Sequence, residues 1–389
     1  MQKLTASRNT GIDLLRGFVM IIMALDHTRD FFHQSVSTTD MLNPATTTPF
    51  FFFTRWITHL CAPTFVFLSG VSAYLASQRR SLKDAIAMLV KRGLFLVFVE
   101  IIFFSLGLSF NPLYNFIFLE VIWAIGVSLI LLALCMKVSD RFVLGVGIIL
   151  FFGHNILDYL SISSDGVSGA LWNIFFLAKG SVISYAPGRL ILILYAILPW
   201  TGVMFMGYSI GQWFVNGYPP AKRIKNLRLL GAALLVMYII LRATNMYGNP
   251  VPWENGEHPI LSFLNTEKYP PSLQFLGMTL GPSLLLLSVF ENVKSGWGRI
   301  VQVYGRAPLF YFIVHFYLLH FLCMIMFFVS GLPLSKATES FMLFRPEEFG
   351  YSLPVVYLIW VLVVTAMYFP CRWFYRYKQT HTQWWLKYI

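Results

Sequence analysis

Charged residues and cysteines are scarce in this sequence. Only 12% of the 389 residues are charged, whereas about a quarter are charged in an ordinary soluble domain. Because 57% of the residues are hydrophobic, the composition excludes a water-soluble fold. The four cysteines are scattered and show no paired spacing, so neither a disulfide framework nor a zinc ribbon is indicated.

The sequence also lacks any nucleic-acid-binding motif. Its formal net charge of +12 is divided among many short loops and does not form one basic surface. Basic residues in such loops are typical of proteins whose loops contact anionic lipid. The expected partner is therefore the lipid bilayer, and no nucleic-acid partner is expected.

Hydrophobic runs recur along the whole chain. A helix of about 20 apolar residues crosses a hydrocarbon core roughly 30 Å thick. The pattern predicts an all-α polytopic membrane protein, folded as a single domain over residues 1–389, with about ten transmembrane helices. The predicted spans lie near 12–33, 56–77, 92–110, 113–135, 141–160, 188–212, 227–245, 272–290, 307–331 and 353–371.

One further apolar stretch, 167–187, is interpreted differently. It is short, contains Lys179 and Gly180, and ends at Pro187, so we interpret it as an interfacial or re-entrant segment. Basic residues collect in short cytoplasmic loops. With ten spans and a cytoplasmic N-terminus, most of the 29 Lys and Arg residues fall on the cytoplasmic side. Both termini are therefore predicted to be cytoplasmic.

The first predicted span carries ionisable residues, which are costly inside a membrane and therefore need a partner or a function. At about 100° per residue, Asp13, Arg16 and His27 share one face of the helix. Arg16 and His27 lie roughly 16 Å apart along that face. A polar track thus runs from a basic cytosolic end to a histidine in the outer half.

A second cluster covers the adjoining face and consists of Asp26, Arg29, Asp30 and His33. One interpretation is a salt-bridge network that fixes the first helix against the second through Arg55 or His59. The other is a functional site in which His27, oriented by Asp26 or Asp30, acts as a general base or as a nucleophile. A buried neutral histidine that only fills a hydrogen bond remains an alternative for His27.

Other polar positions lie on later spans. His315 is mid-span in GRAPLFYFIVHFYLLH, and Lys268 and Tyr269 lie in NTEKYPPS at the outer mouth of the eighth span. In the second span, the small residues of SGVSA at 69–73 predict a close approach by a neighbouring helix.

The motif IDLLRGFVMIIMALDH, residues 12–27, resembles the first helix of the transmembrane acyltransferase superfamily, with its D-x-x-R-G pattern and a histidine in the outer half. Further segments are similar to the bacterial branch related to the catalytic domain of heparan-alpha-glucosaminide N-acetyltransferase. They are ALDHTRDFF, FFFTRWITHLCAPTFVFLSG, LPWTGVMFMGYSIG, FLNTEKYPPSLQFLGMTLGP and YGRAPLFYFIVHFYLLH. The resemblance extends from about residue 9 to residue 330.

The resemblance implies transfer of an acetyl or other acyl group from cytosolic acyl-CoA to an outer-side acceptor, either a small molecule such as an amino sugar or a glycan. Arg16 matches the arginine near the CoA end, and His27 matches the histidine of acyltransferase family 3. The heparan enzyme carries its histidine in the loop before the second span, where this chain has none before His59. Either His27 or His59 is therefore a candidate for the functional histidine.

These arguments give three groups of candidate residues. The catalytic candidates are His27, Asp26, Asp30 and His59. The cofactor-binding candidates are Asp13, Arg16 and Arg306, with acetyl-CoA or another acyl-CoA as co-substrate. The substrate-binding candidates are Arg29, Arg55, Lys268, Tyr269 and His315.

Two other functions remain open. The buried charges would also serve a transporter or channel as a proton or ion relay. A metal site would use oxygen and nitrogen ligands from Asp26, His27, Asp30, His33 and His59, but no tight His pair is present and no metal is expected. The expected location is the bacterial inner membrane, and a homodimer is compatible with the sequence.

Overall fold

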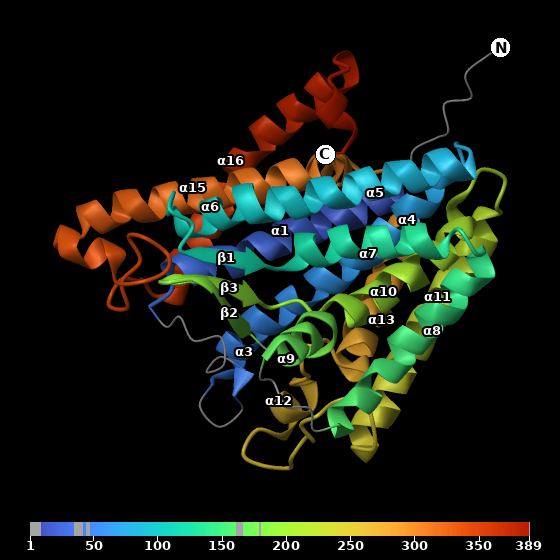
Figure 1. Cartoon of the computed structure of the whole chain (residues 1–389), viewed down its shortest axis with the longest axis horizontal. Helices are drawn as coiled ribbons and strands as arrows, with labels where there is room; N and C mark the ends of the chain where they lie inside the picture. The colour runs from blue at the N-terminus through green and yellow to red at the C-terminus, as the bar shows by residue number, and fades with distance from the viewer. Residues whose placement is uncertain (1–8, 35–41, 44–46, 161–165, 179, 389) are drawn as a thin grey trace.

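The computed structural model describes residues 9–34, 42–43, 47–160, 166–178 and 180–388 (Figure 1). Most of it, 73%, is helical. The α-helices are α1 (Thr10–Phe32), α3 (Pro49–Trp56), α4 (Cys61–Ser77), α5 (Leu82–Val99), α6 (Ser105–Ser109), α7 (Val121–Cys135), α8 (Asp140–Gly153), α9 (Gly166–Trp172), α10 (Ile197–Ile210), α11 (Pro220–Thr244), α12 (Pro259–Leu264), α13 (Leu273–Phe290), α14 (Gly296–Arg306), α15 (Pro308–Val329) and α16 (Leu353–Thr380).

Short 3-10 and π-helical turns extend several of these helices. They are η1 (Ile57–Leu60), η2 (Glu100–Phe104), η3 (His154–Tyr159), η4 (Asn173–Leu177), η5 (Gly211–Phe214), η6 (Leu334–Thr338) and η7 (Trp384–Lys387). Through η1, α3 and α4 form one helical segment, and through η2, α5 and α6 form another.

Within the described residues, six helical segments are long and apolar enough to cross a membrane, which identifies an integral membrane protein. They are Pro49–Ser77, Asp140–Tyr159, Pro220–Thr244, Leu273–Phe290, Pro308–Val329 and Leu353–Thr380. Each of the other expected spans coincides in part with a helix: α1, the α5–α6 segment, α7 and α10. At 23 residues α1 is long enough to span, but it carries the charged side chains of the candidate site.

Two expected spans begin as strands, which corrects the expectation of an exclusively helical chain. In the expected spans 113–135 and 188–212, the first residues form β1 (Phe116–Leu119) and β3 (Arg189–Ile193), which pair in parallel. β2 (Ser181–Ala186) pairs antiparallel with β3, so the sheet order is β1-β3-β2. The apolar runs FIFL and RLILI favour strands because β-branched and aromatic side chains fit a pleated sheet.

In its described residues, the segment 167–187 is not one continuous helix. It contains α9, the π-helical turn η4 and β2. A turn with Gly188 at φ +70° then connects β2 to β3. Lys179, expected in this segment, lies outside the described residues. The interfacial or re-entrant position of the segment 167–187 remains a prediction.

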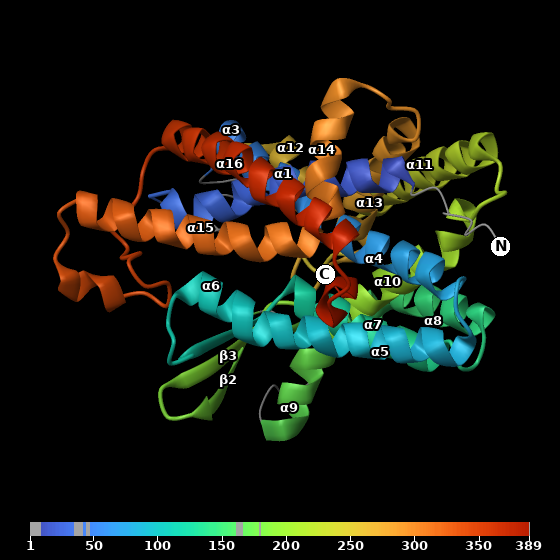
Figure 2. The ribbon, with the colours of Figure 1, turned by 90° about the horizontal axis from the view of Figure 1, so that it is seen from above.

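The helices form two groups with α4 and α10 between them. Figure 2 shows α1, α14 and α16 in its upper half and α5, α7 and α8 in its lower half. α1 packs against α4, α13, α14, α15 and α16. A Cβ atom built on Gly17 would lie 2.0 Å from the Val301 carbonyl oxygen, and one on Gly305 would lie 1.9 Å from the Asp13 carbonyl oxygen. Only glycine therefore allows α1 and α14 to cross this closely.

The close approach predicted for residues 69–73 is confirmed. A Cβ atom on Gly70 of α4 would lie 2.1 Å from the carbonyl oxygen of Met204 in α10. Reciprocally, a Cβ atom on Gly207 would lie 2.1 Å from the carbonyl oxygen of Phe67. The two glycines let α4 and α10 meet backbone to backbone.

The two ends of the molecule differ. The turns that join α4 to α5, α7 to α8 and α10 to α11 lie at one end, on the right in Figures 1 and 2. The sheet and the end of α15 lie at the opposite end. This separation places the basic clusters near residues 79–83 and 222–228 at the same end of the molecule.

Candidate functional site

Three cavities follow one another along α1. The N-terminal cavity, of about 600 Å³, includes Asp13 and Arg16 in its lining. The middle cavity, of about 280 Å³, is lined by Arg16 and Met20. The histidine cavity, of about 340 Å³, is lined by His27 and Asp30, among others. The polar track predicted on the first helix thus lies along a series of cavities.

Adjacent cavities share wall residues. Arg16 and Ser72 line both the N-terminal and the middle cavity. Phe65, Val121 and Phe312 line both the middle and the histidine cavity. The middle cavity and the histidine cavity are therefore adjacent, and an aromatic and aliphatic wall is common to both.

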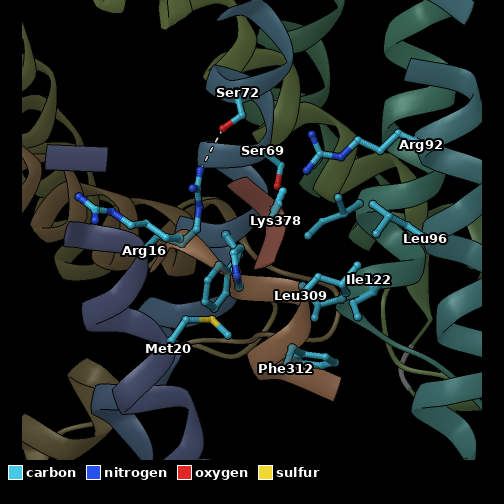
Figure 3. Close-up of a pocket in the computed structure, with 15 residues that line it drawn as sticks. Arg16, Met20, Ser69, Ser72, Arg92, Leu96, Ile122, Leu309, Phe312 and Lys378 are labelled. Atoms are coloured by element: carbon cyan, nitrogen blue, oxygen red, sulfur yellow. Dashed lines mark hydrogen bonds between the residues drawn. The ribbon is translucent and has the colours of Figure 1, made fainter. Parts of the chain in front are cut away.

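Four basic side chains from four helices line the middle cavity, and they are Arg16 of α1, Arg92 of α5, Arg306 of α14 and Lys378 of α16. Figure 3 shows Arg16 and Arg92 on opposite sides of the cavity, with Ser69 and Ser72 near them. The Arg16 Nη2 atom donates a hydrogen bond to the Ser72 hydroxyl at 3.0 Å. Such a cluster suits a polyanion, because arginine donors match the oxygens of phosphate.

Asp13 neutralises part of this cluster. Its carboxylate lies 3.5 Å from Arg16 and 3.7 Å from Arg306. Arg92, by contrast, forms no ion pair with a described residue, and its Nε is buried without a hydrogen-bond partner there. The middle cavity thus holds a cationic group whose charge the described protein residues do not balance.

The other end of the middle cavity is apolar. Met20, Leu309 and Phe312 lie away from Arg92 and Ser72 in Figure 3. The cavity therefore offers a basic part for a charged group and an apolar part for an uncharged chain.

His27 lies in the wall of the histidine cavity and contacts a second histidine. Its Nδ1 atom is 2.7 Å from Nε2 of His315, which is fully buried on α15. The Nδ1 atom of His315 is 2.9 Å from the Tyr311 carbonyl oxygen. Phe316 packs against His27 with ring centroids 4.3 Å apart. We expected Asp26 or Asp30 to orient His27, and this expectation is corrected: the side chain that forms the hydrogen bond with His27 is His315.

The acidic residues of the first helix pair with arginines instead. Asp26 forms ion pairs with Arg29, at 2.6 Å, and with Arg55 of α3. Asp30 pairs with Arg29 at 2.7 Å. The predicted salt-bridge network between the first two helices is therefore present, and it acts through Arg55. Asp26, Asp30 and Arg55 still line the histidine cavity, whereas Arg29 does not line it.

His59 occupies a different environment. It is 1% exposed, packs against Phe275 with ring centroids 5.3 Å apart, and does not line the histidine cavity. Neither ring nitrogen has a hydrogen-bond partner among the residues that the structure describes. Of the two candidate histidines, His27 is the one that lines the histidine cavity.

The opposite wall of the histidine cavity is formed by aromatic and charged side chains. Lys268 and Tyr269 line it, as do Tyr195 and Glu120. The Lys268 ammonium lies 4.9 Å from the Tyr269 ring centroid and 6.0 Å from that of Tyr195. The Glu120 backbone N–H donates to the buried Glu100 carboxylate at 2.6 Å, which fixes the start of α7 at this wall.

Several cavity residues were not named individually as site residues from the sequence, among them Arg92, Lys378, Ser72, Glu120 and Tyr195. The span assignment counts Arg92 and Lys378 among the basic residues of cytoplasmic loops. In the structure they lie within α5 and α16. Glu120 precedes α7 directly, and an acidic residue between two apolar runs is the signal that would have found it.

The metal alternative gains no geometric support. No group of three or more His, Cys, Asp or Glu side chains in the described part of the chain is placed to hold a metal ion. Asp26 and Asp30 bind arginines, and His59 lies off the cavity.

Comparison with known proteins identifies the family. The sequence matches the family described as heparan-alpha-glucosaminide N-acetyltransferase, catalytic, over residues 8–243, more than half of the chain. This match includes α1 with Arg16 and His27, and it ends before Lys268, Arg306 and His315. A search of curated proteins found no match to this chain. The chain belongs to the family of the heparan-alpha-glucosaminide N-acetyltransferase catalytic domain, a family of membrane acetyltransferases.

Proposed function

We propose that this protein transfers an acetyl or other acyl group from cytosolic acyl-CoA to an acceptor on the outer side of the membrane. The observation that carries the proposal is the series of three cavities along α1, from the basic cluster at Arg16 to His27. The proposal includes ten spans, both termini in the cytoplasm and a bacterial inner membrane. Membership of an acetyltransferase family does not favour the transporter alternative.

The basic cluster would hold the phosphates of CoA. Arg16 and Ser72 lie where the N-terminal and middle cavities meet, so phosphates there contact Arg16, Arg92 and Arg306. The pantetheine arm then extends along the apolar part of the middle cavity towards Phe312. Arg16 and His27 are roughly 16 Å apart along α1, a distance that an extended pantetheine arm spans.

The histidine cavity would hold the acceptor. Its carboxylates Asp30 and Glu120 accept hydrogen bonds from hydroxyl or ammonium groups. The rings of Tyr195 and Tyr269 offer apolar faces, and the Lys268 ammonium can donate to an acceptor oxygen. A small polyhydroxylated acceptor, an amino sugar or the end of a glycan fits this combination of groups.

His27 would carry the chemistry. As a general base it removes a proton from the acceptor while the acceptor attacks the thioester carbonyl, or as a nucleophile it carries the acyl group transiently. Asp26 would act through its ion pairs with Arg29 and Arg55, which hold α1 and this wall in place. His59 remains the second candidate histidine.

The proposal is tested with purified protein, [1-14C]acetyl-CoA and a panel of amino sugars. Wild-type protein should release CoA and acetylate one of the acceptors. His27→Ala should lower the turnover at least about 100-fold while acetyl-CoA binding is retained.

His59→Ala is the matched control and should keep its turnover. If His59→Ala abolishes turnover and His27→Ala does not, the functional histidine is on the second helix. If neither variant loses activity in a folded, CoA-binding protein, the acyltransferase proposal fails for this cavity. Amino-sugar flux into empty proteoliposomes without CoA release would support a transporter.

A further inference from the structure

The hydrogen bonds of His315 determine which of its ring nitrogens carries a proton. Its Nδ1 atom lies 2.9 Å from the Tyr311 carbonyl oxygen. A carbonyl oxygen can only accept, so Nδ1 carries a hydrogen. His315 is fully buried, and its ring contacts are Tyr311, Phe312, Phe316 and His27. Because no described carboxylate forms an ion pair with it, a charged ring would be costly there.

A neutral His315 with a hydrogen on Nδ1 has a lone pair on Nε2. This Nε2 atom lies 2.7 Å from Nδ1 of His27. One hydrogen must lie between the two nitrogens, and it therefore belongs to His27. The chain of hydrogen bonds thus runs from His27 Nδ1–H to His315 Nε2, and from His315 Nδ1–H to the Tyr311 carbonyl.

We infer that His315 is a positioning residue that holds His27 in its Nδ1–H tautomer, so that the lone pair on His27 Nε2 is directed to the histidine cavity. No hydrogen bond to this Nε2 is found within the described residues, and His27 lines that cavity. The inference rests on the proposed function for the role of His27. The two histidines lie 288 positions apart in the sequence.

The tautomer fits a complete proton cycle. The acceptor O–H or N–H proton moves to His27 Nε2 as the acceptor attacks the thioester carbonyl. The C–S bond then breaks, and the CoA sulfur takes the proton from Nε2, which gives the acylated acceptor and CoA thiol. The Nδ1–H bond to His315 persists throughout and stabilises the transient imidazolium.

Loss of this contact would free the His27 ring. A neutral histidine with its hydrogen on Nε2 cannot accept a proton there, and a histidine in the wrong tautomer loses orders of magnitude in catalysis. His315→Phe keeps the ring shape but removes the acceptor for His27 Nδ1–H. His315→Gln supplies a side-chain carbonyl oxygen that can accept the same hydrogen bond.

The experiment combines kinetics with 15N NMR of the histidines. For His315→Phe, kcat should fall about 100-fold or more, with KM for acetyl-CoA and acceptor within threefold of the wild-type value. His315→Gln should keep kcat within about tenfold of wild type, because the acceptor atom is restored. In the wild-type spectrum His27, assigned by comparison with His27→Gln, should be protonated on Nδ1, and in His315→Phe it should lose this preference.

The matched control is His320→Phe. His320 is buried on the same helix, but its nitrogens contact the carbonyl oxygens of Gly107 and Leu343 and not His27. Its removal should leave the His27 tautomer unchanged.

Two results would overturn the inference. They are a wild-type His27 protonated on Nε2 in the neutral ring, and a His315→Phe protein with wild-type kcat. If the His315→Phe protein does not fold, the wild-type spectrum alone still tests the tautomer of His27. Absence of acetyl transfer in the wild type would defeat the proposed function, whereas the spectrum tests the tautomer independently of activity.

Discussion

Arg92→Ala is the cleanest perturbation of the proposed CoA site. Arg16 and Arg306 share the Asp13 carboxylate, so removing either one also leaves that carboxylate with less compensation. Arg92 lines the same cavity without an ion-pair partner among the described residues. Its removal should therefore report the interaction with the ligand and little else.

The magnitude follows from the chemistry of the contact. A hydrogen bond to a charged group contributes about 1.5–3 kcal/mol, and about 1.4 kcal/mol corresponds to a factor of ten in Kd. Arg92→Ala should thus raise the Kd for CoA about 10- to 150-fold in calorimetry of the purified protein. Binding of pantetheine, which lacks the phosphates, should not change.

Lys91→Ala is the matched control. This substitution removes the same charge from the neighbouring position, but the Lys91 side chain is exposed and does not line the cavity. Its Kd for CoA should stay within about threefold of wild type, because an exposed, screened charge contributes little. Wild-type CoA affinity in a folded Arg92→Ala protein would refute the assignment of phosphates to the middle cavity. An equal loss of pantetheine affinity would show that the side chain acts through structure.

Three other predictions test the acceptor wall, the ion-pair network and the topology. Glu120→Gln should raise the acceptor KM about tenfold with the acetyl-CoA Kd unchanged, because one charge-assisted hydrogen bond is weakened; an unaltered KM would remove Glu120 from the acceptor site. Arg55→Met should destabilise the protein by about 3 kcal/mol, the lower end for a broken buried pair, because Asp26 keeps Arg29; unchanged thermal unfolding in detergent would count against the network. Reporter fusions after Lys225 should report cytoplasm and fusions in 250–260 the outer side; the reverse pattern would defeat the assigned orientation.

The polar track on α1 could be predicted because helical periodicity alone places Asp13, Arg16 and His27 on one face. The contact between Asp26 and Arg55 was accessible for a similar reason. Asp26 lies on the first predicted span and Arg55 at the start of the second, and a buried carboxylate needs a cationic partner. These parts of the site depend on local geometry and on the cost of burying charge.

Other parts of the site depend on packing between distant segments. Nothing in the sequence near Arg92 indicates that α5 directs it towards Arg16, and the contact of His27 with His315 joins residues 288 positions apart. The sheet was missed for a different reason. Short apolar runs such as 116–119 and 189–193 are compatible with a helix or a strand, and periodicity does not distinguish them.

A structure of the protein with bound CoA tests the central claim most directly, because it locates both ends of the cofactor relative to α1. The account predicts phosphate density within hydrogen-bonding distance of Arg16 and Arg92, with the pantetheine arm passing Phe312 and the sulfur facing His27. CoA phosphates bound away from the middle cavity, or a sulfur directed away from the histidine cavity, would contradict it.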